Sequence, residues 1–164
     1  MKKYAAHYLF PGDRNPIAKG IIKVDPSGLI LELINPVNGL SEQEGMEFHN
    51  GIICPAFVNV FHEFEDERFF RKFPLLQKYN HLKPERLNTE KDILSWIKAI
   101  QRENLQLTLD ELIRIFTLDA AKSIKLEKEV GSLEKGKRPG LMLISGMDYR
   151  NLRLSEKSYL KMLI

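Results

Sequence analysis

The chain has 164 residues, of which 43% are hydrophobic and 29% charged, and its net charge is +3. This composition is ordinary for a globular protein with one core, and the single cysteine, Cys54, excludes a disulfide within the chain. Basic and acidic residues are interspersed, which argues against a nucleic-acid-binding face. The sequence has neither an apolar run of 18 residues nor the apolar core of a signal peptide. We therefore expect a soluble, cytoplasmic protein that binds neither membrane nor nucleic acid.

The N-terminal third is predicted to form strands, because apolar and β-branched runs alternate with Pro, Gly, Asn and Asp. Residues 25–28 (Asp-Pro-Ser-Gly) suit a type I turn and predict a hairpin. Residues 46–54 predict either a pair of strands or one bent strand, with residues 49–51 (His-Asn-Gly) at the bend. The predicted strands are residues 3–10, 20–24, 29–34, 46–54 and 57–61.

Residues 62–87 lack a regular period. Residues 62–72 are densely charged with aromatic residues between the charges, and residues 73–87 contain two prolines. Proline interrupts both helices and sheets. We interpret this span as irregular, with at most one helical turn.

Two helices are predicted next. In the first, near residues 89–103, apolar residues recur at i, i+3, i+4 and i+7, and Thr89 is placed to cap the N-terminus. The second, residues 108–124, begins with Thr108 and Glu111, the spacing of a capping box in which each side chain accepts a hydrogen bond from the other residue's backbone N–H.

The tail returns to short apolar segments separated by glycine and proline, and its predicted strands are residues 141–144, 151–154 and 160–164. The order of strands, then helices, then strands predicts an α+β fold in which one sheet assembly is built from both ends of the chain.

Two segments resemble the amidohydrolase superfamily. Residues 50–65, NGIICPAFVNVFHEFE, are similar to the family's first barrel strand, G-x-x-x-P-G-F-V-N-x-H-x-H. Residues 107–144 contain DAAKSIKLEKEVGSLEKGKRPGLMLI and are similar to its final helix and return strand, T-x-N-A-A-x-x-L-G followed by G-S-x-x-x-G-K-x-A-D-L. The pattern is closest to the chlorohydrolase and cytosine-deaminase-like branch.

The resemblance implies an amidohydrolase-type composite β-sandwich of N- and C-terminal strands beside a (β/α)8 barrel. In the family, the barrel binds one or two metals through a His-x-His on strand 1, often a carbamylated lysine, two further histidines and an aspartate. A metal-bound water then attacks the substrate.

This sequence departs from the pattern at the first metal-binding motif. The His-x-His positions carry Phe61 and Glu63, and His62 occupies the spacer, which points to the opposite face of a strand. Elsewhere, Ala56 replaces a glycine and Gly140 replaces the aspartate of the C-terminal signature.

The distance between the two motifs also departs from the family. Only 42 residues lie between Glu65 and Thr108, whereas a barrel of this type needs about 250. We therefore expect a truncated relative in which a helical insert replaces the barrel. The expected division is a β-sandwich of residues 1–56 and 131–164, and a remnant barrel strand, loop and two helices in residues 57–130.

No catalytic or cofactor-binding residue is predicted, and no metal is expected. The residual metal candidates are His62, Glu63, Glu65 and His81, with zinc or iron as the metal, because histidine and carboxylate ligands suit both. An i, i+4 pair of His81 with Glu85 is doubtful because Pro84 lies between them.

Other isolated residues have simpler interpretations. Cys54 lies in an apolar strand and is expected to be a small core residue rather than a nucleophile. His7 and His49 are expected to be packed or surface histidines.

Three functions remain open. The first is a non-catalytic amidohydrolase-like protein, either a binding or regulatory module or a remnant without activity. The second is a reduced metal-dependent hydrolase that acts on a C–N bond. The third is a subunit that pairs with a full-length amidohydrolase. A homodimer is also expected for two reasons. Residues 57–61 would otherwise leave an exposed strand edge, and the nearby phenylalanines would otherwise lack burial.

Overall fold

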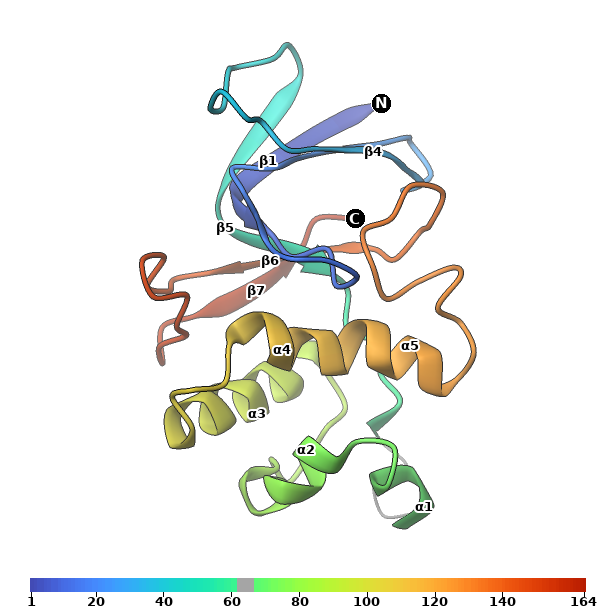
Figure 1. Ribbon diagram of the computed structural model, residues 1–164, viewed down its shortest axis with the longest axis vertical. Coiled ribbons are helices and arrows are strands. Elements are labelled where there is room, and N and C mark those ends of the chain that lie inside the picture. The colour runs from blue at the N-terminus through green and yellow to red at the C-terminus, as the bar shows by residue number, and fades with distance from the viewer. Residues whose placement is uncertain (62–66) are drawn as a thin grey trace.

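The computed structural model describes residues 1–61 and 67–164 (Figure 1). Its strands form one sheet in the order β4-β3-β1-β5-β6-β7, with β2 paired to β1. The strands are β1 Lys2–Leu9, β2 Ile17–Ala18, β3 Ile21–Val24, β4 Ile30–Ile34, β5 Met46–Pro55, β6 Leu141–Ser145 and β7 Tyr159–Met162. The β1–β5 pair is parallel, and the other pairs are antiparallel.

Both ends of the chain meet in this sheet at β5, which pairs with β1 on one side and with β6 on the other. Figure 1 shows the sheet bending along β5, with β4 and β6 on opposite sides of the bend, and buried apolar side chains lie within it. These side chains include Ile30 from β4, Ile53 from β5 and Leu143 from β6. The predicted α+β class is confirmed, and the sheet does not close into a barrel.

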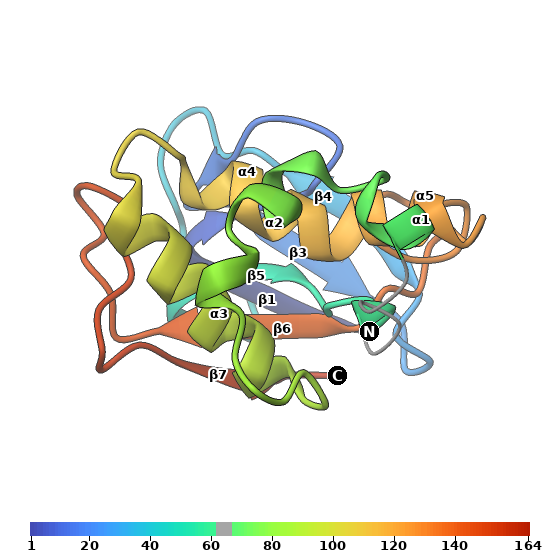
Figure 2. The ribbon, with the colours of Figure 1, turned by 90° about the horizontal axis from the view of Figure 1, so that it is seen from below.

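The helices follow β5 and lie between it and β6 in the sequence. They are α1 Glu67–Phe70, α2 Pro74–Lys78, the 3₁₀ helix η2 Asn80–Leu82, α3 Glu90–Glu103, α4 Leu109–Arg114, the π-helical turn η3 Ile115–Asp119 and α5 Ala120–Ser123. Figure 2 shows these helices in front of the sheet, on one of its faces. Ile52 and Cys54 of β5 and Met142 of β6 pack against them in the larger core.

The two predicted helix starts are confirmed. Thr89 caps α3 and Thr108 caps α4, each in a capping box with the residue three positions later. The predicted hairpin is also present: Gly28 donates its N–H to the Asp25 carbonyl at 3.1 Å, and the Asp25 carboxylate accepts from Ser27 and Leu29 N–H.

Two predicted strands are wrong. Residues 57–61 leave the sheet, and the N–H of Val58 donates to the carbonyl of Phe116 at 2.8 Å instead of to a strand. Residues 151–154 lie in a loop, where Arg153 forms an isolated bridge with Asp148. An apolar, β-branched run forms a strand only where a neighbouring strand can pair with it.

The expected homodimer rested on a strand edge at residues 57–61 and on phenylalanines that needed burial. Residues 57–61 form no strand, and Phe61, Phe69 and Phe73 are buried within the single chain, whereas Phe70 is half-buried. Phe64 lies outside the described residues. Homodimerisation therefore stays a prediction without support from these rings.

Candidate functional site

The position that resembles the family's first metal ligand lies in an aromatic core. The ring of Phe61 is 1% exposed. Its centroid lies 4.8 Å from that of Phe116, 5.5 Å from that of Phe73 and 6.2 Å from that of Phe69. Such separations are typical of packed aromatic pairs.

The helical side of this cluster is fixed by Phe116 in the π-helical turn. The side-chain hydroxyl of Thr117 donates back to the Ile113 carbonyl at 2.9 Å, and the Phe116 carbonyl accepts from Val58. Trp96 packs edge-on against Phe116 at 5.8 Å and donates its indole N–H to the Tyr79 carbonyl at 3.1 Å. The segment after β5 is therefore held against α3 and η3 by backbone and ring contacts.

The residual metal candidates fall into two groups. His62, Glu63 and Glu65 lie outside the described residues. His81 lies on the surface at η2, where its Nε2 is 3.0 Å from the Glu103 carboxylate rather than beside Glu85. Residues 1–61 and 67–164 contain no group of three or more His, Cys, Asp and Glu side chains placed to hold a metal ion.

Cys54 and the two N-terminal histidines have structural surroundings. Burial raises the pKa of the Cys54 thiol, so the reactive thiolate is disfavoured. His7 accepts a hydrogen bond from Gly51 N–H at 3.3 Å and stacks on Tyr149 at 4.2 Å. His49 lies 3.6 Å from the Glu47 carboxylate. Burial accounts for Cys54 and the contacts account for His7 without a catalytic role, whereas the His49 Nε2 is buried without a hydrogen-bond partner among the described residues.

The Gly-Ser-Leu-Glu-Lys-Gly-Lys motif of residues 131–137 forms a structural turn. Ser132 is fully buried. Its hydroxyl accepts a hydrogen bond from the Lys137 ammonium at 2.6 Å and donates one to the carboxylate of Glu134. The next residue, Leu133, donates its N–H to the Pro11 carbonyl at 2.8 Å. The motif thereby joins the C-terminal segment to the N-terminal loop.

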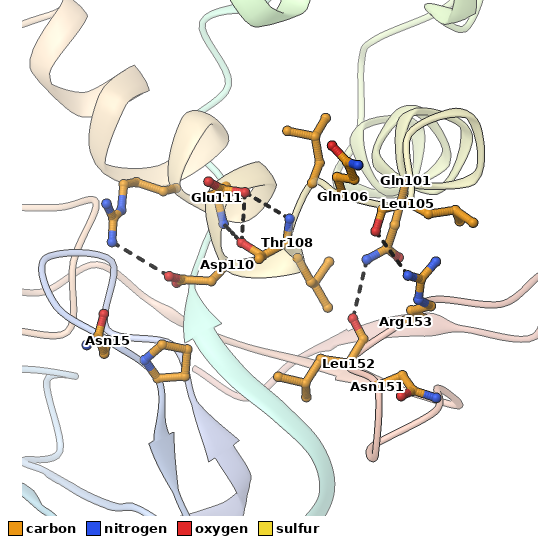
Figure 3. Close-up of a pocket in the computed structure, with 14 residues that line it drawn as sticks. Asn15, Gln101, Leu105, Gln106, Thr108, Asp110, Glu111, Asn151, Leu152 and Arg153 are labelled. Atoms are coloured by element: carbon orange, nitrogen blue, oxygen red, sulfur yellow. Dashed lines mark hydrogen bonds and ion pairs between the residues drawn. The ribbon is translucent and has the colours of Figure 1, made fainter.

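A cavity of about 530 Å³ opens where four segments meet (Figure 3). The loop after β1 contributes Asn15, the end of α3 contributes Gln101, and α4 contributes Asp110 near its start and Arg114 at its end. The loop between β6 and β7 contributes Arg153. These residues are distant in the sequence, which is why the sequence did not predict this cavity.

Asp110 combines partial burial with a nearby cation. Burial raises the pKa of its carboxyl, and the Arg114 guanidinium at 3.6 Å offsets only part of that rise. Asp119, the last residue of η3, also has a pKa that burial raises, and Lys122 and Arg114 offset only part of that rise. The only local signal in the sequence was the i, i+4 spacing of Asp110 and Arg114.

Part of the chain is similar to a known protein family. The model of the amidohydrolase family matches residues 87–160, a little under half of the chain. Over these residues the chain is similar to the amidohydrolase family. No curated protein matches the chain.

The amidohydrolase-family segment includes α3, the continuous helix from α4 to α5, β6 and the start of β7. The sequence resemblance in residues 107–144 falls within it and is confirmed. The resemblance in residues 50–65 lies outside the matched segment and stays a prediction. None of the helices in the described parts of the chain is both long and apolar enough to cross a membrane.

Proposed function

We propose that this protein is a non-catalytic relative of the amidohydrolases, a truncated pseudoenzyme that serves as a binding or regulatory module. The observation that carries the proposal is the place of Phe61. The resemblance aligns this residue with the first metal ligand, and its ring is 1% exposed among three other phenylalanine rings. A phenyl ring cannot replace histidine, aspartate, glutamate or cysteine as a zinc ligand.

The length of the chain between β5 and α4 supports the same proposal. Residues 56–108 are all that separates these elements, against the roughly 250 residues of a complete barrel. The described part of this interval forms α1, α2, η2 and α3 and contributes no strand. A metal site assembled from several barrel strands has no counterpart among these elements.

The reduced-hydrolase alternative depends on His62, Glu63 and His81. The described member of that set, His81, is paired with Glu103 on the surface, and both side chains are about half exposed. An exposed pair of this kind lacks the closed surroundings that tune a catalytic metal and its bound water.

The test is a hydrolysis assay with cytosine and a panel of cyclic amides, with Zn²⁺, Fe²⁺ or Mn²⁺ added. We expect no turnover above the rate with metal alone. The matched variant is Glu63→Ala, because Glu63 holds the second ligand position of the resemblance. Metal-dependent turnover by the native chain that this variant abolishes would refute the proposal.

A further inference from the structure

The cavity beside α4 is a separate feature from the aromatic core, and its size suits a small molecule. Its volume of about 530 Å³ lies within the roughly 300–1,000 Å³ typical of ligand pockets. The wall combines polar groups with apolar side chains, which are Pro16, Leu105, Leu107, Leu109 and Leu152. A ligand with an apolar body and one polar end would match this lining.

Several polar groups of the cavity are already engaged within the protein. Thr108 and Glu111 bind each other in the capping box. Gln101 donates to the Leu152 carbonyl at 3.3 Å and accepts from Leu154 N–H at 2.9 Å, and Arg153 donates to the Leu105 carbonyl at 3.0 Å (Figure 3). These groups shape the cavity, and because they already bind within the protein, few of their hydrogen-bonding positions remain for a ligand.

Asp110 and Arg114 differ from them. Their ion pair at 3.6 Å is longer than the roughly 2.7–3.2 Å of an N–H···O hydrogen bond. The Arg114 Nε is buried without a hydrogen-bond partner among the described residues, so it is the terminal nitrogens of the guanidinium that face a ligand. The cavity therefore presents a carboxylate acceptor and a guanidinium donor side by side, and neither makes a short hydrogen bond within the described chain.

The two charges cancel, so the pair attracts a molecule by its arrangement of donor and acceptor more than by its net charge. A primary carboxamide has this arrangement, because its carbonyl oxygen accepts and its NH₂ donates from the same carbon. The oxygen would face Arg114 and the NH₂ would face Asp110. A carboxylate ligand would be repelled by Asp110, and an amidinium ligand by Arg114.

We infer that this cavity is a binding site for a small neutral molecule with a primary carboxamide at one end and an apolar body. The carboxamide bridges Asp110 and Arg114, and the body packs on the leucines of the wall. The site does not depend on the proposed loss of catalysis, because its polar pair, Asp110 and Arg114, is not part of the hydrophobic core around Phe61, although Leu109 of the wall is.

Three probes of one shape test the inference. Benzamide is neutral, benzoate carries a negative charge and benzamidine a positive charge, and all have the same ring. In ¹H–¹⁵N spectra we expect benzamide to shift the amides of Leu109, Arg114 and Leu152 with millimolar affinity, as is usual for a fragment of this size. We expect benzoate and benzamidine to bind at least about fivefold more weakly.

The substitution test uses Asp110→Asn, with Glu90→Gln as its control. Both changes remove a first-turn carboxylate from a capped helix, but only Asp110 lines the cavity. We expect Asp110→Asn to weaken benzamide binding at least about fivefold and Glu90→Gln to leave it unchanged. The probe ranking on the native chain decides the question if Asp110→Asn does not fold.

Three results would overturn the inference. One is the absence of localised shifts with benzamide up to about 20 mM, well above the affinity expected for such a fragment, which would mean that water alone fills the gap. Another is tighter binding of benzoate or benzamidine, which would identify a plain anion or cation site. The third is unchanged benzamide affinity in a folded Asp110→Asn variant.

Discussion

At the scale of single residues, we expect the largest change in the free energy of unfolding from a substitution of Phe61. Its ring is buried against three others, so Phe61→Ala leaves a cavity and should lower the free energy of unfolding by about 3–5 kcal/mol. Phe48→Ala is the control, because the Phe48 ring is 46% exposed and its loss should cost less than about 1 kcal/mol. Urea denaturation measures both, and equal losses would contradict the packing described.

Asp119 carries a prediction about pH. Burial raises its pKa in the folded protein above the ordinary value, so the folded state binds the proton more tightly than the unfolded state. Its contribution to stability is complete below the unfolded pKa of about 3.9 and is lost as the pH rises through the folded pKa. Asp119→Asn should therefore gain stability relative to the native chain as the pH rises.

The measurement is the difference in unfolding free energy between Asp119→Asn and the native chain at pH 3 and at pH 7. We expect the unfolding free energy of the native chain to fall relative to that of Asp119→Asn between pH 3 and pH 7, by less than about 1 kcal/mol. A difference that stays constant, or that changes in the opposite direction, would show that burial does not control this carboxyl.

At the scale of elements, Gly131 controls how the turn of residues 131–137 approaches η3 and α5. Its φ is +88°, and a Cβ there would lie 2.7 Å from the Ala121 Cβ and 2.9 Å from the Thr117 carbonyl oxygen. Gly136 has the same φ of +88° with no atom within 4 Å of the added Cβ. The two positions separate backbone strain from steric conflict.

We expect Gly131→Ala to lower the free energy of unfolding by about 1–3 kcal/mol more than Gly136→Ala does. Strain at positive φ is common to both variants, so the difference reports the collision with the helix. Thermal or urea denaturation of the two variants provides the comparison. Similar losses would mean that the turn can move away from Ala121 at little cost.

The elements that the sequence predicted are those whose signals are local. Thr89 and Thr108 begin helices because a capping box needs only residues three positions apart, and Gly28 closes a hairpin within four residues. Residues 57–61 were predicted as a strand from composition alone, whereas their structure depends on the Phe116 carbonyl, which comes from distant sequence. The π-helical turn that contains Phe116 has no comparable local signal.

At the scale of the whole molecule, the sequence predicted the α+β class and the joining of both ends in one sheet. It also predicted the family of the C-terminal part, since the motif of residues 131–137 survives as a structural turn. It did not predict the cavity, because Asn15, Asp110 and Arg153 come together only when the loop after β1, α4 and the β6–β7 loop have packed.

Our central proposal is that an aromatic core occupies the position that resembles the first metal ligand of the amidohydrolases. The most direct measurement is the metal content per chain, by elemental analysis of protein purified without chelators or a histidine tag. We expect a ratio near zero for zinc, iron and manganese. A value near one metal per chain that Glu63→Ala removes would contradict it, because the metal would then be held at the position resembling the family's second ligand.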